Sequence, residues 1–195
     1  MKWVTPKLLH WCAALLLGGA FLAQNRPDAP EPPPRLEAFT LSDQFERAHT
    51  IAFPRERPLL LTVADRKGAA QVQGWVAPIR ERFGARLDQA GVADVSKAPG
   101  FLRGRVRAGF REEYTHPVLL DWQGRVCRAV KAERGQVTVL LVSRRGEIVF
   151  RAGGAVAPDV LERLSRAVEE MLAAPPAPEP PASALPPSAP AAGGD

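Results

Sequence analysis

The residues best suited to covalent chemistry are two cysteines, Cys12 and Cys127. A thiol acts as a nucleophile or redox centre when it is ionised and accessible. Cys12 lies inside an apolar N-terminal stretch, so Cys127 is the one candidate catalytic residue of the folded part. Arg125 and Arg128 flank it and would favour a thiolate at an exposed site. The alternatives are a buried, unreactive cysteine and a thiol that forms a mixed disulfide with a partner.

Three aspartates form a second candidate site, because each directly follows an apolar run of the chain. These are Asp65, Asp94 and Asp121. The carboxyl ends of parallel strands meet at one edge of a sheet, where ligands usually bind. Three carboxylates there could hold a cation or act as acid and base. The alternative is that each aspartate caps a helix or closes a turn.

Other arrangements with catalytic or metal-binding potential are absent from the sequence. His49 and His116 stand alone, without a second histidine or cysteine at ligand spacing. No phosphate-binding loop or nucleophile elbow occurs. We therefore expect no metal and no cofactor. The net charge is +5 with acidic and basic residues interleaved, so nucleic-acid binding is not expected.

The two ends of the chain differ in composition from its middle. Lys2 and Lys7 precede an apolar run over residues 8–23, which predicts a signal peptide or membrane anchor over 1–23. Residues 24–35 are rich in proline and are expected to form a stiff linker. Residues 174–195 consist mostly of proline and alanine and are expected to be disordered. The interpretation is an exported bacterial protein, periplasmic or secreted, with membrane contact only through an uncleaved N-terminal segment.

The remaining segment, 36–173, has the size of one domain. A continuous apolar run at residues 59–64 predicts a strand buried on both faces. Apolar residues then recur at helical spacing, which predicts a helix that Pro78 kinks and Gly84 ends. The members of this stripe are Val72, Trp75, Val76, Ile79 and Phe83.

The later part of the domain continues the alternation of strands and helices. Strands are expected at 87–93, 117–120, 137–142 and 147–150, with the last two joined as a hairpin. A basic helix over 97–113 is weakened by glycines, and a final helix begins with Asp159 as its cap. This order predicts an α/β domain with a mixed sheet and helices on both faces.

Several segments in this order resemble the peroxiredoxin-like type of the thioredoxin-like superfamily, the alkyl hydroperoxide reductase and thiol-specific antioxidant proteins. They are Phe39-Thr40-Leu41-Ser42-Asp43, Arg57-Pro58-Leu59-Leu60-Leu61, Ala77-Pro78-Ile79, His116-Pro117-Val118-Leu119-Leu120-Asp121 and the run from Val139 to Val149. The resemblance implies a three-layer thioredoxin-like domain, with a C-terminal hairpin and helix, over about 135 residues of this chain.

The chain departs from this family where the family carries its redox chemistry. The loop after the first core strand, Asp65 to Gln73, contains no cysteine, and the segment 135–138 has no proline where the family has a cis-proline. We therefore predict a redox-inactive module that binds a protein of the cell envelope, with Asp65, Arg66, Lys67 and Gly68 as its binding loop. The alternatives are an atypical antioxidant or thiol oxidoreductase that uses Cys127 and a ligand or cation binder that uses the aspartates.

Overall fold

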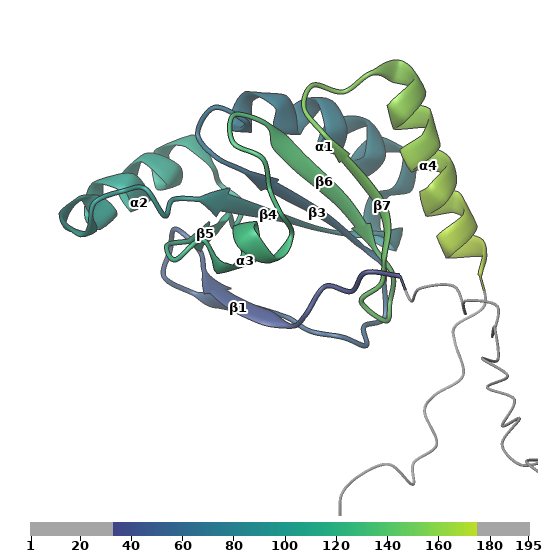
Figure 1. Ribbon diagram of the computed structural model, residues 1–195, viewed down its shortest axis with the longest axis horizontal. Coiled ribbons are helices and arrows are strands. Elements are labelled where there is room, and N and C mark those ends of the chain that lie inside the picture. The colour runs from purple at the N-terminus through teal and green to yellow at the C-terminus, as the bar shows by residue number, and fades with distance from the viewer. Residues whose placement is uncertain (1–32, 175–195) are drawn as a thin grey trace, which may run out of the picture. The chain divides into compact units, whose positions relative to one another are not determined.

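The computed structural model describes residues 33–174, which fold into two sheets and four α-helices (Figure 1). The smaller sheet is a hairpin of β1 (Phe39–Ser42) and β2 (Ala48–Ile51). The larger sheet has five strands in the order β5-β4-β3-β6-β7. The predicted α/β class is confirmed.

The two central strands are β3 (Leu59–Ala64) and β6 (Val137–Val142), and every residue of both is buried. Their continuous apolar runs are what a strand covered on both faces requires. β3 runs parallel to β4 (Asp88–Asp94) and antiparallel to β6. β5 (Leu119–Asp121) lies parallel to β4, while β7 (Ile148–Gly153) pairs antiparallel with β6. The sheet is therefore mixed, as predicted, and ends in the expected hairpin.

One face of the sheet is covered by α1 (Ala69–Phe83) and α4 (Pro158–Ala173) (Figure 1). Trp75, Ile79 and Phe83 from α1 are buried there, together with Leu164 and Val168 from α4. The predicted apolar stripe is thus the buried face of α1. Pro78 lies inside this helix, and Gly84 forms its C-terminal cap.

The opposite face is covered by the β1–β2 hairpin and by α3 (Arg125–Ala129), so helices lie on both faces. The core on this face is made of Leu36, Ile51, Val126, Cys127 and Val130 packed against the sheet. α3 was not predicted, because five residues are too few to show a helical period. This short helix holds Cys127 and so determines the environment of that thiol.

Two helix boundaries differ from the expectation. α2 spans Arg103–Glu113 and follows a short 3₁₀ turn over Gly100–Leu102, so it begins later than residue 97. Asp159 is not the cap of α4: the cap is Ala157, and Pro158 is the first helical residue. Proline fits this first position because its φ angle is already helical and its missing N–H has no partner to lose. Asp159 lies instead in the first turn, where its charge favours the helix dipole.

The predicted signal or anchor over 1–23 and most of the predicted linker and tail lie outside the described residues. The domain makes contacts from Pro34 onwards, because the Pro34 carbonyl accepts a hydrogen bond from the Ile148 N–H and Arg35 forms a bridge with Glu147. Within residues 33–174, none of the helices has the length and apolar character needed to cross a membrane.

Candidate functional site

The loop between β3 and α1 occupies the position where the resemblance placed redox chemistry, and Asp65 fixes its shape. One carboxylate oxygen accepts hydrogen bonds from the backbone N–H groups of Lys67 (3.0 Å) and Gly68 (2.8 Å). The other accepts from the Gly135 N–H at 2.9 Å. Burial alone would raise the pKa of Asp65, but these three backbone donors and the charge of Lys67 outweigh it, so the pKa is lowered. Asp65 is therefore ionised and joins two loops by its hydrogen bonds.

Gln71, in the first turn of α1, makes the second link between the same two loops. Its Oε1 accepts a hydrogen bond from the Val137 N–H at 3.0 Å, and its Nε2 donates to the Gly135 carbonyl at 3.5 Å. The backbone of the segment before β6 is thus bonded within the domain rather than offered to a ligand.

Gly68 shows how closely the two loops approach. A Cβ atom on this residue would lie 2.5 Å from the Gln136 carbonyl group and 2.9 Å from the Val137 nitrogen. Contacts this short with backbone atoms cannot be relieved without moving a loop. The point of α1 nearest to the segment 135–137 therefore has no room for any side chain, a cysteine included.

Of the predicted binding loop, Arg66 and Lys67 are exposed, whereas Asp65 is half-buried and Gly68 is buried. Within residues 33–174 neither cation forms an ion pair. The loop thus presents two solvated positive charges on a backbone that Asp65 holds in place. The family's cis-proline has no counterpart here: the cis peptide bond of this domain is Phe53–Pro54, in the loop after β2.

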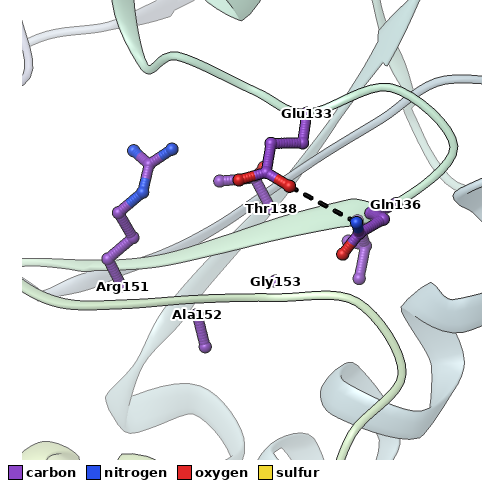
Figure 2. A pocket seen from close by; sticks show the side chains of 7 residues that line it. Glu133, Gln136, Thr138, Arg151, Ala152 and Gly153 are labelled. Atoms are coloured by element: carbon purple, nitrogen blue, oxygen red, sulfur yellow. Dashed lines mark hydrogen bonds between the residues drawn. The ribbon is translucent and has the colours of Figure 1, made fainter.

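A small pocket of about 180 Å³ lies next to this region, between the segment 133–138 and β7 (Figure 2). Glu133 and Gln136 form one wall and are joined by a hydrogen bond of 3.3 Å. Arg151 lies at the other end of the pocket. Its guanidinium donates to the carbonyls of Val130 and Lys131, so it holds the end of α3. The pocket is too small for most metabolites, which need about 300 Å³ or more.

The three strand-end aspartates have separate local partners. Asp94 accepts hydrogen bonds from the N–H and the hydroxyl of Ser96, at 3.0 and 2.6 Å. Asp121 accepts from the Arg125 N–H (3.0 Å) and the Cys127 N–H (3.1 Å). Asp94 and Asp121 face each other in the sheet register. No group of three histidine, cysteine or acidic side chains in the described part of the chain could hold a metal ion. The aspartates therefore close turns and cap α3.

Cys127 is 6% exposed, and the structure describes it as a free thiol. Burial raises the pKa of the Cys127 thiol strongly, and the carboxylates of Asp94 and Asp121 raise it further. Arg125 and Arg128 were expected to favour a thiolate, but both side chains are exposed while the thiol points into the core. The neutral thiol is thus the stable form, and it behaves as a small apolar core group.

A second and larger pocket was missed by the sequence analysis. It is a groove of about 870 Å³ between β1 on one side and α3 and the end of β5 on the other, and we call it the β1–α3 groove. Residues 35–42 line one wall of the groove. Arg107, Trp122 and Arg125 are among the residues that line the rest of it. These walls are some eighty residues apart in the sequence, so no local pattern could indicate the groove.

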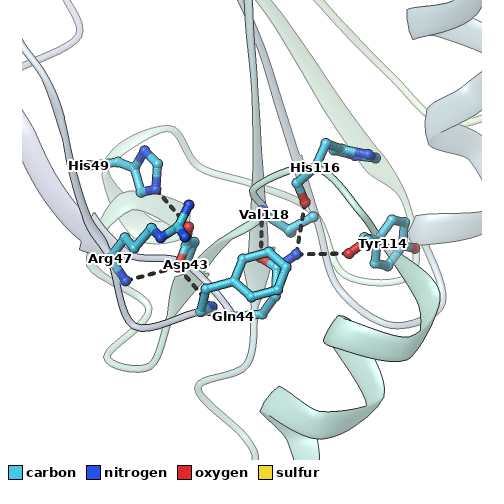
Figure 3. A network of polar contacts seen from close by, with 8 residues as sticks. Asp43, Gln44, Arg47, His49, Tyr114, His116 and Val118 are labelled. Carbon is cyan, nitrogen blue, oxygen red and sulfur yellow. Dashed lines mark hydrogen bonds and ion pairs between the residues drawn. The ribbon is translucent and has the colours of Figure 1, made fainter.

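A buried polar network attaches the hairpin to the rest of the domain (Figure 3). The Gln44 side chain, which is fully buried, donates to the carbonyls of Tyr114 (3.2 Å) and His116 (2.8 Å) and accepts from the Val118 N–H (2.9 Å). Gln44 thus satisfies three backbone groups of the segment that leads into β5. Any displacement of the hairpin would leave those groups without partners.

Asp43, the other buried polar residue of this turn, is equally well bonded. It accepts from the backbone N–H groups of Phe45 (2.8 Å) and Arg47 (2.9 Å) and lies 2.8 Å from His49 Nε2. Burial alone would raise the pKa of Asp43, but the Arg47, His49 and Phe45 hydrogen bonds outweigh it, so the pKa is lowered. Asp43 is therefore a structural carboxylate that fixes the hairpin turn.

With this geometry established, the domain can be compared with known proteins. No family model matches the chain, and no curated protein matches it. Solved structures do match it. A putative thiol:disulfide interchange protein DsbE from Chlorobium tepidum aligns over 73% of this chain and 98% of its own, with a TM-score of 0.56 and 14% identity.

The domain has a thioredoxin-like fold. An exposed lipoprotein thioredoxin from Streptococcus pneumoniae aligns over 67% of this chain and 98% of its own, with a TM-score of 0.52 and 14% identity. The peroxidoxin BcpB from Mycobacterium tuberculosis aligns over 72% and 96%, with a TM-score of 0.51 and 15% identity. The resemblance that the sequence segments suggested is thus confirmed at the level of the fold. Activity has to be argued from this chain's own residues.

Proposed function

We propose that this protein is a redox-inactive thioredoxin-like module that acts by binding a protein partner. The observation that supports this most directly is the packing at Gly68. The loop from Asp65 to Gln73 contains no cysteine, and a Cβ on Gly68 would lie 2.5 Å from the backbone of Gln136. The loop after the first core strand therefore carries no thiol, and at Gly68 it has no room for a side chain.

The environment of Cys127 supports the same proposal. The alternative of an atypical thiol enzyme needs an exposed, ionisable Cys127. This thiol is buried, and both its burial and the carboxylates of Asp94 and Asp121 raise its pKa. Thiol chemistry at neutral pH is thus disfavoured at the one cysteine of the domain.

The loop Asp65–Gly68 is the recognition surface that we propose for the partner. Arg66 and Lys67 project from a backbone that Asp65 holds with three hydrogen bonds. A loop that is already ordered loses little conformational entropy on binding, which favours recognition. The two cations suit an acidic patch on the partner.

We also propose that the protein is exported to the cell envelope. The support is the pattern of residues 1–23, with Lys2 and Lys7 before an apolar run. One structural neighbour is described as an exposed lipoprotein thioredoxin, and another as a putative thiol:disulfide interchange protein. A fusion of residues 1–35 to alkaline phosphatase tests this, since that enzyme needs disulfides that form outside the cytoplasm. We expect activity that is lost when 1–23 are deleted; equal activity of both fusions would refute export.

The redox proposal is tested with the full chain, the Cys127→Ser variant and a Cys12→Ser variant that leaves Cys127 as the only thiol. Peroxide consumption and disulfide reduction are measured alongside the rate of Cys127 labelling by a thiol reagent, folded and in denaturant. We expect slow labelling in the folded protein, fast labelling in denaturant, and no turnover that depends on Cys127. Fast labelling of the folded protein with turnover that disappears in Cys127→Ser would establish the thiol-enzyme alternative.

The binding proposal is tested with a photo-crosslinking amino acid at Lys67 and, as a control, at the exposed Arg163 on α4, far along the chain from the loop. We expect a discrete adduct in cells at position 67 that is absent at position 163 and is weakened by Arg66→Glu. The same adducts at both positions, or none at position 67, would refute the loop as the recognition surface.

A further inference from the structure

The β1–α3 groove has one property that the proposed recognition loop lacks, which is an open strand edge. Its volume of about 870 Å³ lies within the range of sites that bind a ligand or a short peptide. Figure 1 shows β1 running along the side of the domain where α3 and β5 lie. Thr40, which lies on this edge, is exposed to solvent.

The hydrogen-bond register of the hairpin determines which backbone groups face the groove. The Asp43 N–H donates to the Arg47 carbonyl at 3.0 Å, so these two residues form a hydrogen-bonded pair. Such pairs alternate with non-hydrogen-bonded pairs along an antiparallel ladder. Leu41 and His49, two positions further along the register, therefore form the next hydrogen-bonded pair.

Thr40 lies opposite Thr50, between two of these hydrogen-bonded pairs. The hydroxyls of Thr40 and Thr50 are 2.9 Å apart, as expected for a close, non-hydrogen-bonded pair. The backbone N–H and carbonyl of Thr40 consequently point away from β2, toward the groove.

The segment with this open edge is fixed at both ends. Arg35 forms a bridge with Glu147, and Asp43 forms a bridge with Leu119. Among the described residues, 37–41 make no backbone hydrogen bond to the body of the domain. The open edge thus resembles an interrupted strand pairing. At a rise of about 3.3 Å per residue, it has room for roughly four residues of an added strand.

The groove wall opposite β1 is basic and carries unpaired donors. Trp122 lies beneath two guanidiniums, Arg103 at 5.3 Å and Arg107 at 5.5 Å from its ring centroid. Trp122 Nε1 and Arg107 Nε are both buried and have no hydrogen-bond partner among the described residues. Unpaired buried donors are rare in folded proteins.

The charges at the groove favour an acidic occupant. Arg35, Arg107 and Arg125 line it, and Glu37 is the one exposed carboxylate among its lining residues. Arg107 Nη1 pairs with Glu46 at 3.0 Å, whereas Arg35 and Arg125 have no carboxylate partner among residues 33–174. The other acidic residue of the lining, Asp121, is buried and already accepts two backbone hydrogen bonds. Positive charge around a strand edge attracts carboxylates and repels basic segments.

We propose that the β1–α3 groove binds an extended acidic segment of a partner protein, which adds to the open edge of β1 as a strand. The backbone of Thr40 pairs with the backbone of this segment, while its carboxylates face the arginines that line the groove. This mode of recognition takes affinity from main-chain hydrogen bonds and specificity from alternate side chains. The proposal rests on the protein-binding role and concerns a surface separate from the loop Asp65–Gly68.

The probe is a fluorescein-labelled six-residue peptide of alternating glutamate and valine, titrated with the full chain and followed by fluorescence anisotropy. Two further peptides replace glutamate with lysine or methylate alternate backbone nitrogens. We expect binding of the acidic peptide, and weakening of about tenfold or more for each of the other two. One lost hydrogen bond of about 1.4 kcal/mol corresponds to tenfold in affinity.

The matched protein variants are Thr40→Pro and Thr50→Pro. Each removes the Thr40–Thr50 hydroxyl contact and one backbone N–H that the hairpin itself does not use. Only the Thr40 N–H faces the groove. We therefore expect Thr40→Pro to weaken binding about tenfold and Thr50→Pro by less than about twofold. Arg125→Glu should weaken binding, while Arg163→Glu on α4 should not.

Circular dichroism establishes whether both proline variants are folded. If either is not, the proposal is decided by the methylated peptide and by the comparison of Arg125→Glu with Arg163→Glu. The proposal is overturned if no binding occurs up to about 1 mM peptide, if acidic and basic peptides bind equally, or if methylation has no effect. These results leave the crosslinking at Lys67 unchanged, so failure of the groove and failure of the recognition loop can be told apart.

Discussion

The recognition loop and the β1–α3 groove differ in how their backbone polar groups are satisfied. Around Gly68, the N–H groups of Gly135 and Val137 are bonded to Asp65 and Gln71. Along β1, the N–H and carbonyl of Thr40 point toward an open groove. The first region is closed by its own side chains, and the second is open. The likeness of fold does not distinguish the two regions, whereas the open backbone groups of β1 indicate where a strand could be added.

The largest expected effect on stability is that of Gln44→Leu, which removes the side-chain hydrogen bonds that attach the β1–β2 hairpin to the rest of the domain. This change leaves the carbonyls of Tyr114 and His116 and the N–H of Val118 without their partner. We expect a loss of about 2–4 kcal/mol in the free energy of unfolding, measured by urea denaturation. The control is Gln73→Leu on the exposed side of α1, which should change stability by less than about 0.5 kcal/mol. Similar losses in both variants would show that Gln44 does not anchor the hairpin.

The second effect tests how tightly the recognition loop is packed. Gly68→Ala places a Cβ against the backbone of Gln136 and should destabilise the domain by about 1–3 kcal/mol. The control is Gly104→Ala in α2, where a Cβ meets nothing within 4 Å. Alanine should stabilise that helix by about 0.5–1 kcal/mol. Thermal unfolding of both variants checks the prediction, and a neutral Gly68→Ala would contradict the closed geometry.

Acid should destabilise both regions through Asp65 and Asp43. The pKa of each is lowered in the folded state from an ordinary value of 3.8. Their contribution is therefore fully present above that value and is lost as the pH falls through the lower folded pKa. We expect Asp65→Asn and Asp43→Asn each to flatten the decline of stability with pH below about 4, measured by urea unfolding across a pH series. An undiminished decline of stability with pH in both variants would refute the assignment.

The smallest expected effect is that of removing the thiol. Cys127→Ala deletes one buried sulfur from the core beneath α3 and should cost about 1 kcal/mol. It should leave peptide binding to the groove unchanged, because Cys127 is not among the groove's lining residues. Differential scanning fluorimetry and the anisotropy titration measure the two outcomes. A loss of binding without a loss of stability would indicate a thiol-dependent role in the groove.

The sequence predicted those elements that carry a strong local pattern. The apolar runs of β3 and β6, and the stripe that includes Trp75 and Phe83, gave the sheet and α1 within a few residues. α3 was missed because its five residues complete little more than one turn. Pro158 altered the start of α4 although Asp159 is a good capping residue.

The sites were harder to predict than the elements. The lack of a cysteine between Asp65 and Gln73 could be read directly from the sequence, but the closeness of Gly68 to Gln136 depends on two segments that only the fold brings together. Asp94 and Asp121, two of the three strand-end aspartates, are partners in the sheet register. Strand-end position could not reveal that each carboxylate bonds to its own turn, because local hydrogen bonds leave no periodic trace in a sequence.

Arg151 has a consequence for how the two regions respond to each other. Its side chain borders the small pocket beside the segment 133–138, and its guanidinium holds the carbonyls of Val130 and Lys131 at the end of α3. α3 in turn forms a wall of the β1–α3 groove. Arg151, on the edge strand β7, thus connects α3, which forms a wall of the groove, to the segment 133–138 beside the recognition loop. A displacement of the end of α3 would therefore break its hydrogen bonds to β7.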